Sequence, residues 1–164
     1  MQIFIIVLDL KVLILLIQIL KVNVPTLKLD EINCILNLWD AWKFTLTNKV
    51  NLDFIGKINS FVSRNESLEW VVLRNGQVDI NGVDYIPSIP IKEEVSKKIE
   101  EILSEDNAIK RSIYLMLYLM RSQIFWDGNK RTSMLVANKI LIQNGCGIIS
   151  IKEENIFEFN GLLT

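Results

Sequence analysis

Two segments that are apolar on nearly every side lie close together in the second half of the sequence. The first runs from Ala108 to Met120 and is apolar almost all round after Arg111, and the second runs from Ser133 to Ile142. A helix without a polar face has to be covered by other helices. Both segments are therefore predicted to form the central pair of a helical bundle.

Other stretches repeat apolar residues at helical spacing and are predicted to surround this pair. One covers Leu29 to Trp42, and another follows Asn51, a residue type that favours the start of a helix. A third is expected to lie on the surface, with lysines and glutamates facing water and an apolar stripe of Ile91, Val95, Ile99 and Ile102. A last short helix is predicted within residues 152–160.

The stretch from Trp70 to Tyr85 has a different character, because it contains two Asn-Gly pairs flanked by β-branched residues. Asn-Gly is the strongest short hairpin signal, since both residues tolerate positive φ. We predict a short hairpin here, closed by the stiff segment from Pro87 to Pro90. The predicted fold class is therefore all-α: a mainly helical bundle with a small β-hairpin flap.

Composition excludes several classes of function. The sequence contains no histidine, which removes every mechanism that needs an imidazole as base, nucleophile or metal ligand. The net charge is −1 and no basic stripe is present, so no nucleic-acid partner is predicted. Cys34 and Cys146 form no CxxC pair, and free thiols in a reducing, cytoplasmic location are expected.

Residues 1–24 form a hydrophobic N-terminal segment whose role the sequence leaves open. Between Ile3 and Leu20 the interruptions are Asp9, Lys11 and Gln18. A spanning helix needs about 20 apolar residues, and each central charge costs about 2.5–3.5 kcal/mol. A helix or strand packed against the domain is favoured, and a membrane anchor through residues 3–20 is the weaker alternative. Residues 25–164 are assigned to one domain.

The junction between the two central segments offers groups that bind phosphate. A Gly-Asn pair that opens a helix leaves backbone N–H groups without helical partners at the positive end of the helix dipole. Arg131 adds a cation with forked donors, and Asp127 supplies a hard oxygen ligand for Mg²⁺. Phe125 is expected to point inward. The alternative is that Asp-Gly-Asn makes only a turn.

This junction reads Q-I-F-W-D-G-N-K-R-T over residues 123–132. It resembles the motif H-x-F-x-D/E-G/A-N-G/K-R of the Fic/death-on-curing (Fido) family and departs from it at the first position. The resemblance covers about residues 28–160, and the predicted hairpin is similar to the family's flap, to which a target segment adds as a strand. It implies a Fic fold that transfers AMP from ATP to a hydroxyl of a target protein. The death-on-curing branch transfers phosphate instead.

The resemblance also implies roles for individual residues. Asp127 would hold Mg²⁺, and Gln123 takes the position of the general base. The phosphates of ATP, or of another nucleoside triphosphate, would lie against Gly128, Asn129, Lys130 and Arg131. A target protein would dock on the flap through Leu73, Arg74, Val78 and Ile80. The family's closing helices continue beyond the position of Thr164, which implies a domain shortened at its C-terminus.

Three departures from the family pattern shape the functional prediction. Gln123 replaces the catalytic histidine, and loss of a positioned base slows a reaction by about 10²–10⁴-fold. Met134 stands where AMP-transferring members carry a further arginine, so the loop, with Lys130, also resembles the death-on-curing version. Ser63 and Glu66 have the wrong spacing for the family's inhibitory motif and are expected to cap locally.

The sequence therefore predicts a nucleotide-binding protein with impaired transferase activity, a pseudoenzyme of the Fic type. Two alternatives stay open. One is a non-enzymatic interaction module whose flap binds a peptide by strand addition. The other is a phosphotransferase of the death-on-curing type that uses a different base.

Overall fold

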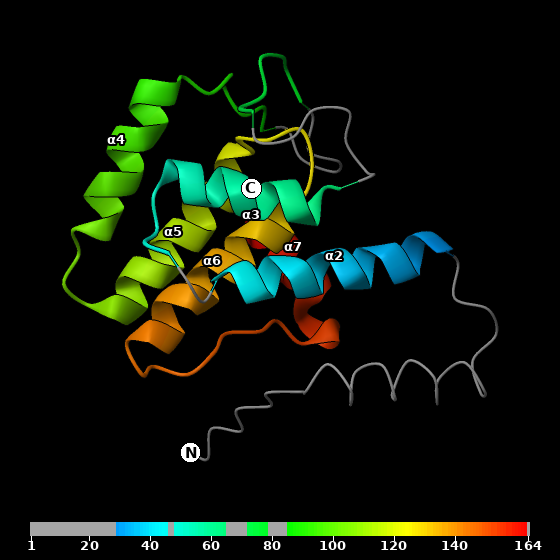
Figure 1. Cartoon of the computed structure of the whole chain (residues 1–164). Helices are drawn as coiled ribbons and strands as arrows, with labels where there is room; N and C mark the ends of the chain where they lie inside the picture. The colour runs from blue at the N-terminus through cyan, green and yellow to red at the C-terminus, as the bar shows by residue number, and fades with distance from the viewer. Residues whose placement is uncertain (1–28, 46–47, 65–71, 79–84, 164) are drawn as a thin grey trace. The chain divides into compact units, whose positions relative to one another are not determined.

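The structure is a computed structural model that describes residues 29–45, 48–64, 72–78 and 85–163. By its internal contacts the chain divides into two units, Met1–Leu36 and Asn37–Thr164. The described helices are α2 (Leu29–Thr45), α3 (Leu52–Val62), α4 (Lys92–Leu103), α5 (Ala108–Ser122), α6 (Asn129–Gln143), the 3₁₀ turn η1 (Glu153–Asn155) and α7 (Ile156–Leu162) (Figure 1). The hydrophobic segment 1–24 lies outside these residues. Within them, no helix has the length and apolar character that a membrane crossing requires.

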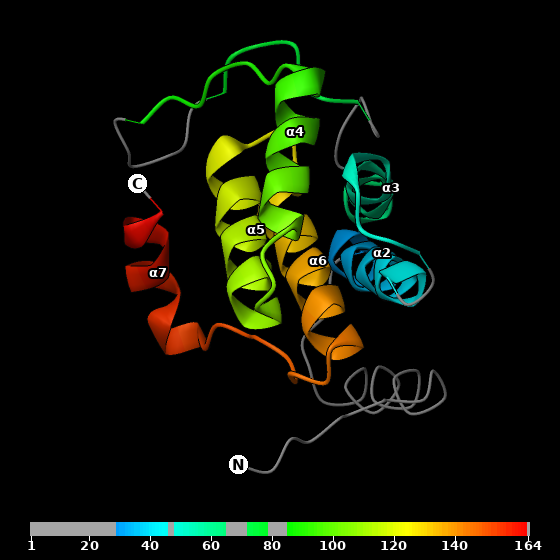
Figure 2. The ribbon, with the colours of Figure 1, turned by 90° about the vertical axis from the view of Figure 1, so that its left-hand side faces the viewer.

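The central pair is α5 and α6, as the sequence predicts. Figure 2 shows them side by side, with α3 and α7 on opposite sides of the pair. Leu115 and Leu119 of α5 face the larger core, to which α3, α4 and α6 also contribute. Met116 and Met120 face a second cluster, against which Phe159 of α7 packs. Neighbouring residues on α5 thus serve two different cores.

The helix predictions hold in part. Asn51 caps α3, and its side-chain oxygen accepts a hydrogen bond from the Phe54 amide at 2.8 Å. Val95, Ile99 and Ile102 of α4 are buried as predicted, whereas Ile91 is half exposed because it precedes the helix as its N-cap residue. The prediction that α5 is covered on every side is wrong for one face, where its apolar residues are exposed: Ile109, Tyr114 and Leu117.

The predicted hairpin is described only at residues 72–78 and at Tyr85, and these residues contain no strand. The second Asn-Gly pair and Ile80 lie outside the described residues. We call residues 72–78 and 85–90 the flap segments. They lie beside the end of α5, because the Arg74 amide donates to the carbonyl of Ile124 at 3.0 Å. In the part of the chain that the structure describes, the fold is all-α.

Candidate functional site

The junction between α5 and α6 is a loop in which two residues adopt left-handed backbone conformations. Gln123 follows α5 with φ 45° and ψ 54°, and Gly128 precedes α6 with φ 72°. The amide of Thr132 donates to the carbonyl of Gly128 at 2.9 Å, which is the first hydrogen bond of α6. The chain therefore leaves one helix and enters the next through residues 123–128, as predicted. The backbone N–H groups ahead of Thr132 lie at the positive end of the α6 dipole.

Asn129 holds this loop together with its side chain. It is 5% exposed, and its Nδ2 donates to the carbonyl of Phe125 at 2.7 Å while its Oδ1 accepts from the Phe125 amide at 3.0 Å. Phe125 itself points into the core and is 2% exposed, as the sequence predicts. The family resemblance implies that Asn129 contacts the phosphates through its backbone. The buried amide adds a second role, because it fixes the curvature of the loop.

Both polar atoms of the Gln123 side chain are engaged within the loop. Its Nε2 donates to the carbonyl of Met120 at 2.5 Å, and its Oε1 accepts from Nδ2 of Asn129 at 3.1 Å. The side chain is half-buried. A neutral amide held in this way positions the loop, but it offers no group that accepts a proton near neutral pH.

Asp127 and Arg131 form an ion pair across the start of α6. Oδ2 of Asp127 lies 3.2 Å from Nη2 of Arg131, and the two side chains remain 46% and 29% exposed. A partly exposed carboxylate beside a helix N-terminus fits Mg²⁺, which takes one or two carboxylates and completes its shell with phosphates and water. Among the described residues no group of three or more carboxylates, cysteines or histidines could hold a metal. Asp127 would thus act with phosphate oxygens.

Side chains at the C-terminal end of α3 hydrogen-bond to the loop, a contact that no sequence pattern predicted. Nδ2 of the buried Asn59 donates to the carbonyl of Asp127 at 2.8 Å and to Oγ1 of Thr132 at 3.2 Å. Oγ of Ser63 donates to the same Asp127 carbonyl at 3.2 Å. The prediction that Ser63 caps its own helix is therefore incomplete, because its hydroxyl also reaches the loop of residues 123–128.

Lys130, which belongs to the predicted phosphate site, and Met134, which stands where the family carries an arginine, both contact other parts of the fold. Nζ of Lys130 donates to Oδ1 of Asn160 on α7 at 2.7 Å. Met134 packs against the second apolar cluster, beside Met116 and Met120. Residues 130 and 131 are successive on a helix, so their side chains point about 100° apart. Of these two cations, Arg131 is the one on the loop side.

The predicted target-binding residues also divide. Leu73 is half-buried and packs against the larger core, and Val78 is half-buried. Arg74 is 1% exposed, and its donors all meet backbone carbonyls, so it does not suit the predicted contact with a target protein. The reason is tertiary: the flap segments fold over this guanidinium.

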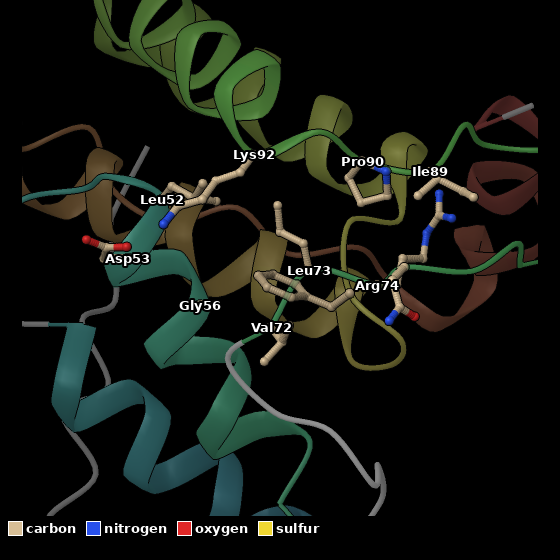
Figure 3. Close-up of a pocket in the computed structure, with 11 residues that line it drawn as sticks. Leu52, Asp53, Gly56, Val72, Leu73, Arg74, Ile89, Pro90 and Lys92 are labelled. Atoms are coloured by element: carbon tan, nitrogen blue, oxygen red, sulfur yellow. The ribbon is translucent and has the colours of Figure 1, made fainter.

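A groove of about 620 Å³ runs between the start of α3 and the flap segments (Figure 3). Leu52, Val72, Leu73 and Pro90 give it a mostly apolar wall, and Phe125 is the single lining residue from the loop. The residues at the start of α6 do not line it. The groove and the loop are therefore neighbouring but separate features.

Comparisons with known proteins agree with this geometry. The model of the Fic/DOC family matches residues 49–141, more than half of the chain. The structure is similar to a solved structure of Fic-1 (residues 134–508) from C. elegans, with a TM-score of 0.71, 23% identity, and coverage of 85% of this chain. The matched part is 45% of that protein, so this chain spans less than half of its length. No curated protein matches the sequence. The chain belongs to the Fic/DOC family.

Proposed function

We propose that the chain binds the phosphates of a nucleoside triphosphate, with Mg²⁺, at the start of α6, and that it is an AMP transferase weakened by Gln123. The observation that carries this proposal is the Asp127–Arg131 pair beside the start of α6, which a loop with two left-handed residues separates from α5. The amides at a helix start and the helix dipole attract an anion, and a guanidinium adds two donors in a fixed fork. Mg²⁺, when bound, would neutralise charge on the phosphates.

The chemical step exposes the weakness of the site. A target hydroxyl would form a bond to the α-phosphorus of ATP while the bond to pyrophosphate breaks, and the hydroxyl proton has to leave. Gln123 stands where a base would accept it, and both polar atoms of its amide are already hydrogen-bonded. Transfer of AMP relies largely on positioning and charge stabilisation, so a low residual rate is compatible with the missing base.

Binding is tested by calorimetry on the full chain with ATP and Mg²⁺. Hydrogen bonds to charged groups contribute about 1.5–3 kcal/mol, so Arg131→Ala should weaken ATP binding about tenfold or more. The matched control is Arg111→Ala, because Arg111 lies on α5 and donates to the carbonyl of Glu105, far along the helix from the loop. Equal affinity of both variants, or no Mg²⁺-dependent binding at all, contradicts the proposal.

Catalysis is tested by the substitution Gln123→His. Histidine is among the residues that tolerate the left-handed conformation of position 123, so the loop should keep its shape. We expect labelling of the chain or of a target in lysate to rise by about 10²–10⁴-fold, measured by mass spectrometry. Gln123→Asn is the control, since it also suits this conformation but adds no base. A histidine variant that labels no faster than the asparagine variant contradicts the proposed catalytic role.

One observation favours phosphate transfer as a second candidate. Met134 occupies the position of the second arginine of AMP-transferring members, and it packs against an apolar cluster and supplies no cation. The same mass-spectrometric experiment separates the two candidates, because added AMP and added phosphate differ in mass. Absence of both labels together with absence of nucleotide binding would favour the non-enzymatic interaction module.

The target protein would dock along the flap segments by adding a strand. Val72 is 57% exposed there, and residues 72–78 form no strand pairing among the described residues. Leu73 and Val78, both half-buried, are better placed than Arg74 to limit which target side chains fit.

A further inference from the structure

We infer that Arg74 is a positioning residue that fixes position 123 and holds the flap segments to the phosphate loop. The part of this inference that concerns catalysis rests on the proposed function. Arg74 is the largest fully buried side chain of the described residues, at 1% exposure. Its burial has to be explained, since Arg is almost never fully buried unless it is paired.

The guanidinium and the main-chain amide of Arg74 both donate hydrogen bonds to carbonyls at the end of α5. Nε donates to the carbonyl of Gln123 at 2.5 Å, and Nη2 lies 3.4 Å from the carbonyl of Ser122. The Arg74 amide donates to the carbonyl of Ile124 at 3.0 Å. Three consecutive carbonyls around position 123 therefore meet one residue of the flap segments.

The same guanidinium also donates hydrogen bonds to carbonyls of the flap segments. Nη1 donates to the carbonyl of Gly76 at 2.6 Å, and Nη2 donates to the carbonyls of Ser88 at 2.6 Å and Pro87 at 3.1 Å. Figure 3 shows the Arg74 side chain extending toward the segment that carries Ile89 and Pro90. One planar group thus joins its own segment and residues 87–88 to the end of α5, which lies 49 residues further along the chain.

Two further contacts join the flap segments to the same region. A Cβ added to Gly76 would lie 2.7 Å from the Trp126 ring, so the loop indole packs directly on the flap backbone. The Arg121 guanidinium lies 4.7 Å from the centre of the Tyr85 ring. Both contacts join the flap segments to residues 121–126.

Among the described residues, the Arg74 side chain donates its hydrogen bonds to backbone carbonyls. Those of Ser122 and Gln123 carry the negative end of the α5 dipole. Burial lowers the pKa of the Arg74 guanidinium from its ordinary value, but arginine stays charged in proteins. A buried cation with neutral partners is a weak source of stability, since an apolar side chain can fill such a space at lower cost. An apolar side chain could not donate hydrogen bonds to these carbonyls and so could not hold the segments in place in this way.

The geometry matters because position 123 is strained. Gln123 has φ 45°, a conformation that residues other than glycine rarely adopt and that neighbouring contacts must hold. Arg74 binds the carbonyls before, at and after this residue. The side chain at position 123 therefore points where it does partly because Arg74 fixes its backbone.

Hydrogen exchange of the full chain tests the inference without relying on catalysis. In Arg74→Met and Arg74→Lys, we expect faster amide exchange in the flap segments and in residues 122–126 together, with protection of α3, α4 and the start of α6 unchanged. Lysine keeps the charge but cannot make the forked contacts, so it should not restore protection. Arg111→Met is the matched control and should leave both regions unchanged. Faster exchange in the flap segments alone, or equally throughout the chain, overturns the inference.

A kinetic measurement tests whether Arg74 affects catalysis through position 123. In the Gln123→His background, Arg74→Lys should lower kcat about 10²-fold, because small misplacements of a reacting group have effects of this size. The Kd for ATP should stay within about twofold, since the start of α6 and Arg131 are untouched. Unchanged kcat per folded molecule overturns the positioning role. If Gln123→His itself is inactive, the proposed function fails, and the exchange experiment still decides whether Arg74 joins the two regions.

Discussion

Gly128 has to be a glycine for two separate reasons. Its φ of 72° is strained for any other residue, and a Cβ would lie 2.5 Å from Oγ of Ser63 and 2.9 Å from Cγ1 of Val62. The last residue before α6 therefore touches the end of α3 with its backbone. The close approach brings the Asp127 carbonyl within reach of Ser63 and Asn59.

We expect Gly128→Ala to destabilise the protein by about 1–3 kcal/mol from backbone strain, with a further loss from the displaced α3. Urea unfolding measures this change. Gly161→Ala is the matched control, because a Cβ there would meet nothing within 4 Å and alanine is the better helix former. Similar unfolding midpoints for the two variants would show that the contact with α3 is not tight.

At the scale of the elements, the loop is held by α3 on one side and by the flap segments on the other. Asn59 of α3 ties the Asp127 carbonyl to the Thr132 side chain of α6. Arg74 ties the end of α5 to the flap segments. The ion pair of Asp127 and Arg131 is therefore carried by a backbone that has little freedom to move.

Asn59→Ala should cost about 1–3 kcal/mol, because the substitution leaves the buried Asp127 carbonyl without one of its donors. It should also weaken ATP binding, since the loop that presents the amides loses its brace. Thermal unfolding and calorimetry measure the two effects. Ser60→Ala, on the same helix, removes an exposed hydroxyl bonded only to the Lys57 carbonyl and should change stability by less than about 0.5 kcal/mol. The prediction is contradicted if both variants behave alike.

At the scale of the whole molecule, α6 buries a lysine within the larger core. Lys139 is 3% exposed, and its Nζ has no hydrogen-bond partner in the part of the chain that the structure describes. The ammonium lies 5.7 Å from the centre of the Phe54 ring. Burial lowers the pKa of Lys139 from its ordinary value, so the folded chain binds a proton at this amine less tightly than the unfolded chain does.

This lysine should make stability depend on pH. The unfolded chain keeps the ordinary pKa of about 10.4 and therefore binds more protons than the folded chain between the lowered pKa and that value. The free energy of unfolding should rise with pH across that window. Lys139→Met should stabilise the protein near neutral pH, and its advantage should shrink as the pH approaches about 10. Urea unfolding at several pH values measures this, with the exposed Lys110→Met as control. A constant advantage at every pH would contradict the prediction.

Features that depend on neighbouring residues were predictable from the sequence alone. The central pair α5 and α6 follows from apolar residues on most sides, and the cap at Asn51 follows from its side chain. The break at residues 123–128 and the inward Phe125 follow from the glycine and from the family motif. In each case the cause lies within a few residues of the effect.

Only the tertiary structure decided which polar side chains support the loop. Asn59 and Asp127 are 68 residues apart, and Arg74 and Gln123 are 49 residues apart, so no local pattern indicates that they meet. The family resemblance placed Arg74 on the target-binding flap, whereas the structure buries it among backbone carbonyls. A buried donor takes whichever carbonyls the folded chain brings to it, and only the fold determines which those are.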